Sequence, residues 1–265
     1  MATNIIIVGA LGQMGKKIAT AVLEGVVPDV RLVGCVENAS RPQIGQEYEL
    51  CKDVKVVSSI EEVGVADAVV IDFSSVQSTR DNLKKANDLK FPMIIGTTGL
   101  EQGDYELAKE VSKAVPVLVS SNMSLGVNLL FWITKLVTER LGDTFDIEII
   151  EAHHRRKKDS PSGTARTLGE VVAEALGQRY DDVVVHGRKG MADRIRPPKE
   201  IGMHAVRGGG IIGDHTVLFA SEEERVELRH MAHDRSVFAA GAVVAAKWIA
   251  SKSPGFYSMR DILGL

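Results

Sequence analysis

The feature that most constrains the fold is a short apolar strand that runs directly into a glycine-rich turn and then a helix. From Asn4 to Val8 the chain is rich in β-branched residues, which is typical of a strand buried on both faces of a parallel sheet. The next seven residues, Gly9 to Gly15, carry glycines at a GxxGxxG spacing. Apolar residues then recur at helical spacing as far as Leu23, and Gly25 closes the segment.

The same alternation of strand and helix continues through the first half of the chain. Repeated βα units predict an α/β fold with a Rossmann-type doubly wound parallel sheet. The predicted strands are Val30 to Val36, Ala68 to Ile71, Met93 to Ile95 and Val115 to Val119, and the predicted helices are Val76 to Leu89 and Leu100 to Lys113.

The pattern changes after Asn122, where a second layer begins. The predicted helices there are Val127 to Leu141 and Phe238 to Ala250, and the clearest strands are Phe145 to Glu151, Ile211 to Phe219 and Arg225 to Ala232. The stretch from about 180 to 232 is strand-like and rich in glycine. We predict a first domain made of residues 1–123 and 236–265, and a second α+β domain with an open mixed sheet over residues 124–235.

Composition and charge argue against several classes of protein. With 45% hydrophobic and 25% charged residues, the chain has the composition of an ordinary globular protein. The net charge of -3 gives no reason to expect nucleic acid or an anionic membrane as a partner. Cys35 and Cys51 belong to no ligand spacing, so we expect neither a disulfide framework nor a metal site. Because no apolar run approaches roughly 18 residues and no leader pattern is present, we expect a cytoplasmic protein.

The glycine turn predicts a dinucleotide site at the start of the first helix. Backbone N–H groups and the positive helix end would point at a pyrophosphate, which the small residues allow to approach closely. The alternative is a tight turn needed only for helix packing. The candidate cofactor contacts in the turn are Gly9, Ala10, Leu11, Gly12, Gln13 and Met14.

Three further places are candidates for contact with the dinucleotide. Glu37 follows the second strand, where a carboxylate accepts hydrogen bonds from ribose hydroxyls and repels a 2′-phosphate; the alternative is an ordinary exposed glutamate. Two loops follow later strands, at the sheet edge where such folds bind ligands, although turn and helix-cap chemistry accounts for them equally well. Their candidate nicotinamide contacts are Gly96, Thr97 and Thr98, and Ser120, Ser121, Asn122 and Met123.

The segment from His153 to Thr164 clusters basic side chains just before a helix. Because adjacent residues of an extended segment point to opposite sides, His153 and His154 should have distinct roles. Histidine can exchange a proton near neutral pH, and a lysine ammonium can hold a carboxylate or supply a proton. Amide groups of Gly163 and Thr164 at the helix start suit an anion. These features predict a site for a small carboxylated substrate beside a hydride donor.

The alternative for this segment is a solvated basic loop or a contact with nucleic acid. The acidic overall balance and the absence of interleaved aromatic residues count against nucleic acid.

A longer match identifies a family. From Glu151 the chain reads E-A-H-H-R-R-K-K-D-S-P-S-G-T, which closely resembles the E-[AL]-H-H-x-x-K-x-D-x-P-S-G-T signature of the 4-hydroxy-tetrahydrodipicolinate reductase family, also called dihydrodipicolinate reductase. The resemblance covers essentially the whole chain, including the GAxGxMG turn, the GTTG loop, the S-N-M-S-x-G-V-N entry to the second domain and the closing M-R-D-[IV]-L.

The resemblance implies a reaction and a set of roles. Hydride would pass from NAD(P)H to C4 of the cyclic dicarboxylate, giving tetrahydrodipicolinate on the way to diaminopimelate and lysine. By position, His153 resembles the proton donor and acceptor, Lys157 the second proton donor, and His154 a substrate ligand, while Gly163 and Thr164 resemble the backbone site for a substrate carboxylate. The first domain would bind the dinucleotide, and the second would bind substrate and assemble a homotetramer through its sheet.

One departure from the family pattern bears on the cofactor. Members that use NADPH well often carry a basic residue directly after the acidic one or inside the glycine turn, and those places hold Asn38, Leu11 and Gln13 here. A preference for NADH over NADPH is therefore our hypothesis. The basic side chains that remain near enough for a 2′-phosphate are Lys16, Lys17 and Arg41.

Two other functions fit parts of the pattern. The first is a different Rossmann oxidoreductase, but an acylating aldehyde dehydrogenase needs a nucleophilic cysteine, and Cys35 and Cys51 both fall in the predicted cofactor half. The second is a regulatory protein that senses the dinucleotide without turnover, which would not need clustered His153, His154 and Lys157.

In the leading mechanism, cofactor and dicarboxylate bind across an interdomain cleft whose closure excludes water.

Overall fold

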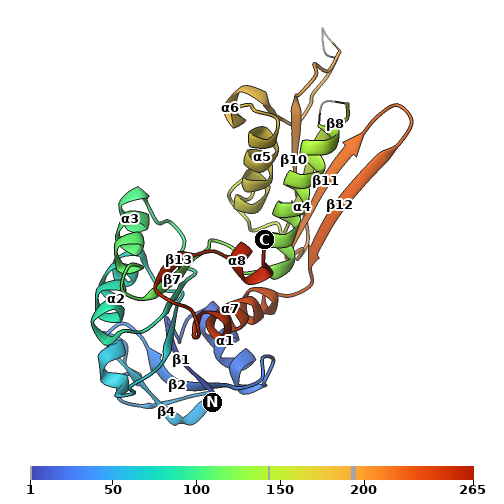
Figure 1. The fold of residues 1–265 in the computed structure, drawn as a ribbon. Helices are drawn as coiled ribbons and strands as arrows, with labels where there is room; N and C mark the ends of the chain where they lie inside the picture. Colours follow the sequence, from blue (N-terminus) through green and yellow to red (C-terminus); the bar gives the residue numbers. More distant parts are fainter. Residues whose placement is uncertain (1, 143, 192–194) are drawn as a thin grey trace. The chain divides into compact units, whose positions relative to one another are not determined.

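The protein is described from a computed structural model, which covers residues 2–142, 144–191 and 195–265. These residues divide into two units, each with its own core. The first contains the residues up to Leu125 together with Ser236–Leu265, and the second is Gly126–Arg235 (Figure 1). Each unit is described by itself below.

The first unit is built on a mostly parallel sheet. Among its described residues the strand order is β13-β7-β6-β5-β1-β2-β4-β3, with only β3 and β4 antiparallel to each other. Neighbouring strands on either side of β1 come from different parts of the chain, which is the topology of a doubly wound fold and confirms the predicted class. The strands are β1 Thr3–Val8, β2 Val30–Val36, β3 Glu47–Tyr48, β4 Cys51–Val57, β5 Val69–Asp72, β6 Met93–Ile95, β7 Pro116–Val119 and β13 Gly255–Tyr257.

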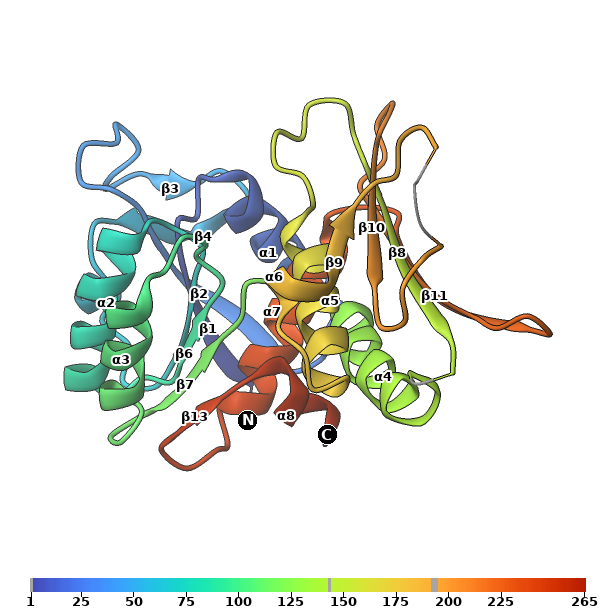
Figure 2. The same ribbon diagram turned by 90° about the horizontal axis from the view of Figure 1, so that it is seen from above.

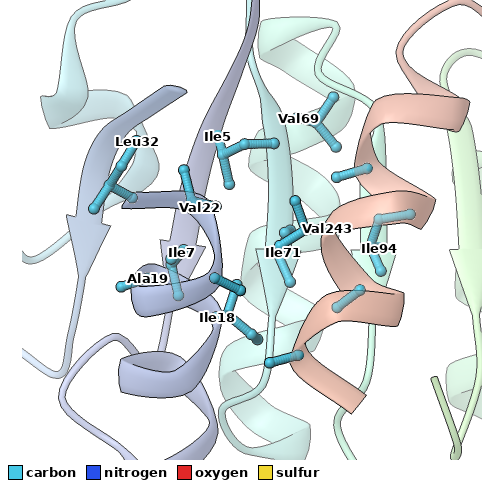
Figure 3. Packing of buried hydrophobic residues seen from close by; sticks show 14 of the residues in the cluster. Ile5, Ile7, Ile18, Ala19, Val22, Leu32, Val69, Ile71, Ile94 and Val243 are labelled. Atoms are coloured by element: carbon cyan, nitrogen blue, oxygen red, sulfur yellow. The ribbon is translucent and has the colours of Figure 1, made fainter. Parts of the chain in front are cut away.

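Helices cover both faces of this sheet. Helices α1 and α7 lie on one face and α2 and α3 on the other (Figures 1 and 2). Figure 3 shows Ile18 of α1 and Val243 of α7 packed over Ile7 and Ile71 of the sheet. The intervening Ile6 belongs to the core of the opposite face, so β1 is buried on both sides. The helices are α1 Gln13–Leu23, α2 Val76–Leu89, α3 Gln102–Val111, α7 Ser236–Ile249 and α8 Met259–Leu263, with a 3-10 turn at Ile60–Val63.

The second unit is an open mixed sheet, as predicted, and its helices pack on one face of it. Its strand order over the described residues is β12-β11-β8-β10-β9, in which β10 is parallel to β8 and β11 is antiparallel to both of its neighbours. Leu168 and Val172 of α5 pack against Ile149 and Val217 of the sheet. The elements are α4 Leu125–Leu141, β8 Asp146–His153, α5 Gly163–Ala175, α6 Tyr180–Val183, β9 Val184–His186, β10 Ile201–Arg207, β11 Gly213–Ala220 and β12 Arg225–Ala232.

Most predicted elements are shifted at an end by one to three residues, and two of these differences have a clear local reason. Strand β8 continues two residues beyond Glu151 because His153 still pairs with Arg207 of β10. Helix α3 begins at Gln102 rather than at Leu100, since a capping box between Glu101 and Asp104 starts it there. Among the described residues, no helix combines the length and the apolar character that a membrane span needs.

Candidate functional site

Packing alone accounts for two of the three glycines in the turn. Gly9 has a φ of +77°, and a Cβ there would lie 2.6 Å from the carbonyl oxygen of Phe73. A Cβ at Gly15 would overlap the carbonyl oxygen of Gly9. Gly12 differs, because it is exposed and forms the N-cap of α1 without a side chain to cap the helix. The tight-turn alternative therefore explains Gly9 and Gly15, whereas Gly12 leaves the start of α1 open to an anion.

Hydrogen bonds from the turn to strand β2 and from Tyr48 to the turn fix its backbone. The amides of Gly9 and Ala10 donate to the carbonyl oxygen of Val36 at 2.9 and 3.3 Å. The hydroxyl of Tyr48, which is fully buried, donates to the carbonyl oxygen of Ala10 at 3.0 Å. The backbone of the turn is thus fixed before any ligand arrives, which lowers the entropic cost of binding one.

Glu37 lies against the turn rather than pointing freely into solvent. Its Oε2 accepts a hydrogen bond from the amide of Leu11 at 3.2 Å, and its Oε1 accepts one from the amide of Asn38 at 3.0 Å. A carboxylate has room for about four such bonds, so it can still accept others. The structure therefore brings Glu37 next to the predicted dinucleotide turn.

The loop after β6 is organised by a buried carboxyl group. Asp72, at the end of β5, accepts hydrogen bonds from the Ser74 amide at 3.0 Å and from the hydroxyl of Thr97 at 3.3 Å. That hydroxyl also accepts a bond from Thr79 at 2.9 Å. Burial raises the pKa of Asp72, although these neutral donors partly oppose the rise. The Thr97 side chain is therefore engaged inside the protein, whereas Thr98 is exposed.

The loop after β7 makes its own turn contacts. The hydroxyl of Ser120 donates to the carbonyl oxygen of Asn122 at 2.8 Å, and Oδ1 of Asn122 accepts from the amide of Ser124 at 2.9 Å. Met123 is buried in the core of the unit, while Ser121 is exposed. The turn-chemistry alternative accounts for these contacts, and the cofactor role of residues 120–123 stays a prediction.

In the second unit, β8 brings Glu151 and His153 to the same buried face. The two residues alternate along the strand and are 0% and 8% exposed. The Nδ1 atom of His153 lies 2.6 Å from Oε2 of Glu151. This pair stands at the centre of the segment that the sequence singled out.

Arg207 of β10 and the start of α5 converge on the same carboxylate. The guanidinium of Arg207 donates to both oxygens of Glu151 at 2.7 Å, and the amide of Ser162 donates to Oε1 at 3.0 Å. Burial by itself raises the pKa of Glu151, but the bonds from His153, Arg207 and Ser162 outweigh it and lower that pKa to about 2. Glu151 is therefore ionised at neutral pH.

His215 of β11 completes the buried cluster. Its Nε2 lies 3.0 Å from the hydroxyl of Ser162, and its ring meets the ring of His153 edge-on at 5.2 Å. Burial, and next the proximity of His153, lowers the pKa of His215 to about 3, so its ring is neutral at pH 7. His215 thus supports Ser162 without adding charge.

The remaining predicted residues surround this cluster. Ser162 is the N-cap of α5, so Gly163 and Thr164 are the first two residues of that helix. The ammonium of Lys157 lies 2.8 Å from Oδ2 of Asp159 and its side chain is 21% exposed. His154 follows β8, and its Nδ1 is buried without a hydrogen-bond partner among the residues that the structure describes. Burial and then the neighbouring arginine and lysine charges lower the pKa of His154.

Sequence reasoning gave no role to Glu151, Ser162, Arg207 or His215. Glu151 and Ser162 lie within the signature, and the spacing of two residues between Glu151 and His153 on one strand was a usable signal. Arg207 and His215 carried no such signal. The structure brings His153 and the start of α5 together through Glu151; it leaves the ammonium of Lys157 paired with Asp159. Within residues 2–142, 144–191 and 195–265, no group of three or more His, Cys, Asp or Glu could hold a metal ion.

Family models match nearly the whole chain. Residues 3–123 match the model described as dihydrodipicolinate reductase, N-terminus, and residues 126–263 match the model described as dihydrodipicolinate reductase, C-terminus. The chain belongs to the dihydrodipicolinate reductase family. Membership decides against the other Rossmann oxidoreductases considered above, and it confirms the resemblance read from the signature.

Curated relatives and a solved structure agree with this family. The chain is 44% identical over 262 residues to the 4-hydroxy-tetrahydrodipicolinate reductase of Syntrophotalea carbinolica, covering 97% of each chain. It is 43% identical over 268 residues to that of Trichlorobacter lovleyi, covering 99% of each. The dipicolinate-bound dihydrodipicolinate reductase from Paenisporosarcina sp. TG-14 has the same fold, with a TM-score of 0.79, 20% identity and coverage of 97% and 98%.

Proposed function

We propose that the chain catalyses the NAD(P)H-dependent reduction of 4-hydroxy-tetrahydrodipicolinate to tetrahydrodipicolinate, in the diaminopimelate route to lysine. The observation that carries the proposal is the buried Glu151–His153 pair beside the start of α5, in a chain 44% identical to a reductase of that name. The dipicolinate bound to a solved member of the same fold is a cyclic dicarboxylate, which supports a substrate of this class.

The first unit would hold the dinucleotide. The exposed Gly12 at the open start of α1 suits the pyrophosphate, and the carboxylate of Glu37 suits the adenosine ribose. When bound, NAD(P)H supplies the hydride for the reaction. The loops at residues 96–98 and 120–123 follow β6 and β7 at the same edge of the sheet, which supports their assignment to the nicotinamide half.

The second unit would hold the dicarboxylate. The amides of Gly163 and Thr164, in the first turn of α5, can donate to one carboxylate of the substrate. His154 would contact the substrate, and its lowered pKa keeps the ring neutral and able to donate or accept a hydrogen bond. Lys157 would exchange Asp159 for a substrate carboxylate, because both offer oxygen to the same ammonium.

His153 would move a proton at its Nε2 atom. The Nδ1 atom faces Glu151, which leaves Nε2 as the nitrogen that can exchange a proton with the substrate. Lys157 would serve as the second proton donor.

We further propose that the enzyme prefers NADH to NADPH. Glu37 is held beside Leu11, where a carboxylate repels a 2′-phosphate. Lys16, one of the basic residues near the turn, is paired with Glu49 at 2.5 Å. This pairing lowers the attraction that Lys16 offers to a phosphate. Comparing kcat/KM for the two cofactors tests the preference, and a clear advantage for NADPH would refute it.

A coupled assay tests the reaction itself. Dihydrodipicolinate synthase generates the substrate in situ, and NADH oxidation is followed by the loss of absorbance at the nicotinamide band. We expect turnover that depends on the synthase product. If absorbance does not fall although NADH binds, the chain is a dinucleotide sensor rather than a reductase. The homotetramer, which light scattering would test, and the cytoplasmic location remain predictions.

A further inference from the structure

The carboxylate of Glu151 has no capacity left for a ligand. Its Oε1 accepts from the Ser162 amide and from one nitrogen of Arg207, and its Oε2 faces His153 and accepts from the other nitrogen of Arg207. These four contacts use all the acceptor sites of a carboxylate. Glu151 is also fully buried, so it acts through its neighbours rather than on a substrate.

These contacts fix the tautomer of His153. An ionised carboxylate can only accept hydrogen bonds, so the proton of the neutral imidazole must lie on Nδ1, which is 2.6 Å from Glu151. The Nε2 atom then carries the lone pair. It faces Gly213, where a Cβ would lie 3.0 Å from it, so the glycine leaves this nitrogen uncrowded. The free nitrogen is thus the one that can take up or release a proton.

Glu151 also holds the start of α5. Its bond from the Ser162 amide joins the strand to the N-cap of the helix, and the hydroxyl of Ser162 accepts from the Ala165 amide at 3.2 Å. The helix start therefore moves with the same carboxylate that orients His153. Arg207 reinforces this link, because it also donates to the carbonyl oxygen of Asp159 at 2.7 Å, in the segment between the strand and the helix.

We infer that Glu151, held ionised by Arg207, is the positioning residue of the reaction: it fixes His153 with Nδ1 protonated and sets the helix start that binds the substrate carboxylate. This inference rests on the proposed function, because it assigns the proton transfer to His153. Without Arg207, a buried carboxylate 2.6 Å from the imidazole would be less stable as an anion and would compete for its proton.

An ordinary structural ion pair is the alternative, and the tautomer of His153 separates the two. An ionised Glu151 can only accept a hydrogen bond from Nδ1 of His153, whereas the amide of a glutamine can also donate one. In Glu151→Gln the proton of His153 should therefore no longer be held on Nδ1 alone. A purely structural role would reduce stability and leave the tautomer in place.

The first experiment measures the tautomer directly, without activity. Protein labelled with [15N]histidine is studied by magic-angle-spinning NMR at about pH 8, and the His153 signals are assigned by their loss in His153→Gln. We expect Nδ1 to be protonated and Nε2 not. The opposite tautomer in the wild-type protein would overturn the inference, whether or not the protein reduces the proposed substrate.

The second experiment tests the positioning role by kinetics. In Glu151→Gln we expect kcat to fall about 100-fold or more and KM for the dicarboxylate to rise, with His153 no longer protonated on Nδ1 alone in the NMR measurement. The matched control is Glu170→Gln on α5, an exposed carboxylate that pairs with Arg166 and should behave as wild type. A folded Glu151→Gln enzyme with an unchanged kcat, or with His153 still protonated on Nδ1 alone, would overturn the inference.

Two experimental outcomes need to be distinguished from a failure of this inference. If the wild-type protein does not reduce the substrate, the proposed function fails, while the tautomer measurement still tests the geometry. If Glu151→Gln does not fold, Glu151→Asp keeps the charge one methylene further from His153 and Ser162. We then expect the lower kcat and higher KM with Nδ1 of His153 still protonated, because an ionised aspartate can only accept a hydrogen bond, and an unchanged kcat would overturn the inference.

Discussion

Mild acid should destabilise the second unit through the buried ring of His215. The residue is 4% exposed, and burial lowers its pKa to about 3, against about 6.5 in an unfolded chain. Because the folded pKa is the lower one, the stability is fully present above pH 6.5 and is lost as the pH falls towards 3. Between pH 7 and pH 5 the linkage relation gives a loss of about 2 kcal/mol from this group alone.

Glu151 acts in a different pH window, so the two effects can be separated. Its folded pKa of about 2 lies below the unfolded value near 4.5, and its stabilising contribution is present above pH 4.5 and lost as the pH falls towards 2. At pH 5 this loss is only about 0.2 kcal/mol. The change from pH 7 to pH 5 therefore reports on histidines.

The positions of the two tryptophans allow the second unit to be followed on its own. Trp132 lies in α4 and Trp248 in α7, so Trp248→Phe leaves one fluorescent reporter in the second unit. Urea unfolding of this protein is measured at pH 7 and at pH 5, with and without His215→Gln. The exposed His186 provides the matched control, as His186→Gln.

We expect His215→Gln to be less stable than its parent at pH 7, because the new side chain fits the contact with Ser162 less well. Between pH 7 and pH 5 it should lose about 2 kcal/mol less than the parent, since the titrating group is gone. His186→Gln should lose as much as the parent. Equal losses in all three proteins would refute the reasoning.

Three other predictions concern single side chains. His153→Gln or Lys157→Ala should lower kcat by roughly two orders of magnitude or more in the coupled assay, and near-normal turnover would reject that assignment. Tyr48→Phe removes the hydrogen bond to Ala10 and should raise the Kd for NADH about fivefold, measured by nicotinamide fluorescence; an unchanged Kd would show that the turn holds its shape without it. Asp72→Asn should lower the free energy of unfolding by about 1–3 kcal/mol in urea, because an amide cannot accept at both positions; an equally stable variant would contradict this.

The parallel sheet was predictable because its central strands are buried on both faces. β1 and β5 each contain a continuous apolar run, and such runs followed by glycine turns and amphipathic helices leave few folds open. β4 was missed, since charged side chains such as Lys52 and Lys55 interrupt it and it lies near the edge of the sheet. β13 is only three residues long, and it is a strand because it pairs with β7.

The candidate site could be predicted only as far as it is contiguous in sequence. The signature from Glu151 to Thr164 contains the strand end, the loop and the helix start. Arg207 and His215 come from β10 and β11, 56 and 53 residues away from their partners Glu151 and Ser162. No local sequence pattern predicts a long-range contact of this kind, because the pairing of distant strands in the sheet brings the two residues together.

The two units each bury one carboxyl group near the end of a strand, and their neighbours give them opposite ionisation behaviour. Asp72 meets only neutral donors, so burial dominates and its pKa rises. Glu151 meets Arg207 and His153, whose hydrogen bonds overcome burial and lower its pKa to about 2. The neutral donors around Asp72 hold its loop but do not stabilise the charge enough to offset burial. Glu151 must stay ionised to keep the proton on Nδ1 of His153, and this difference is the reason that the second carboxylate needs an arginine.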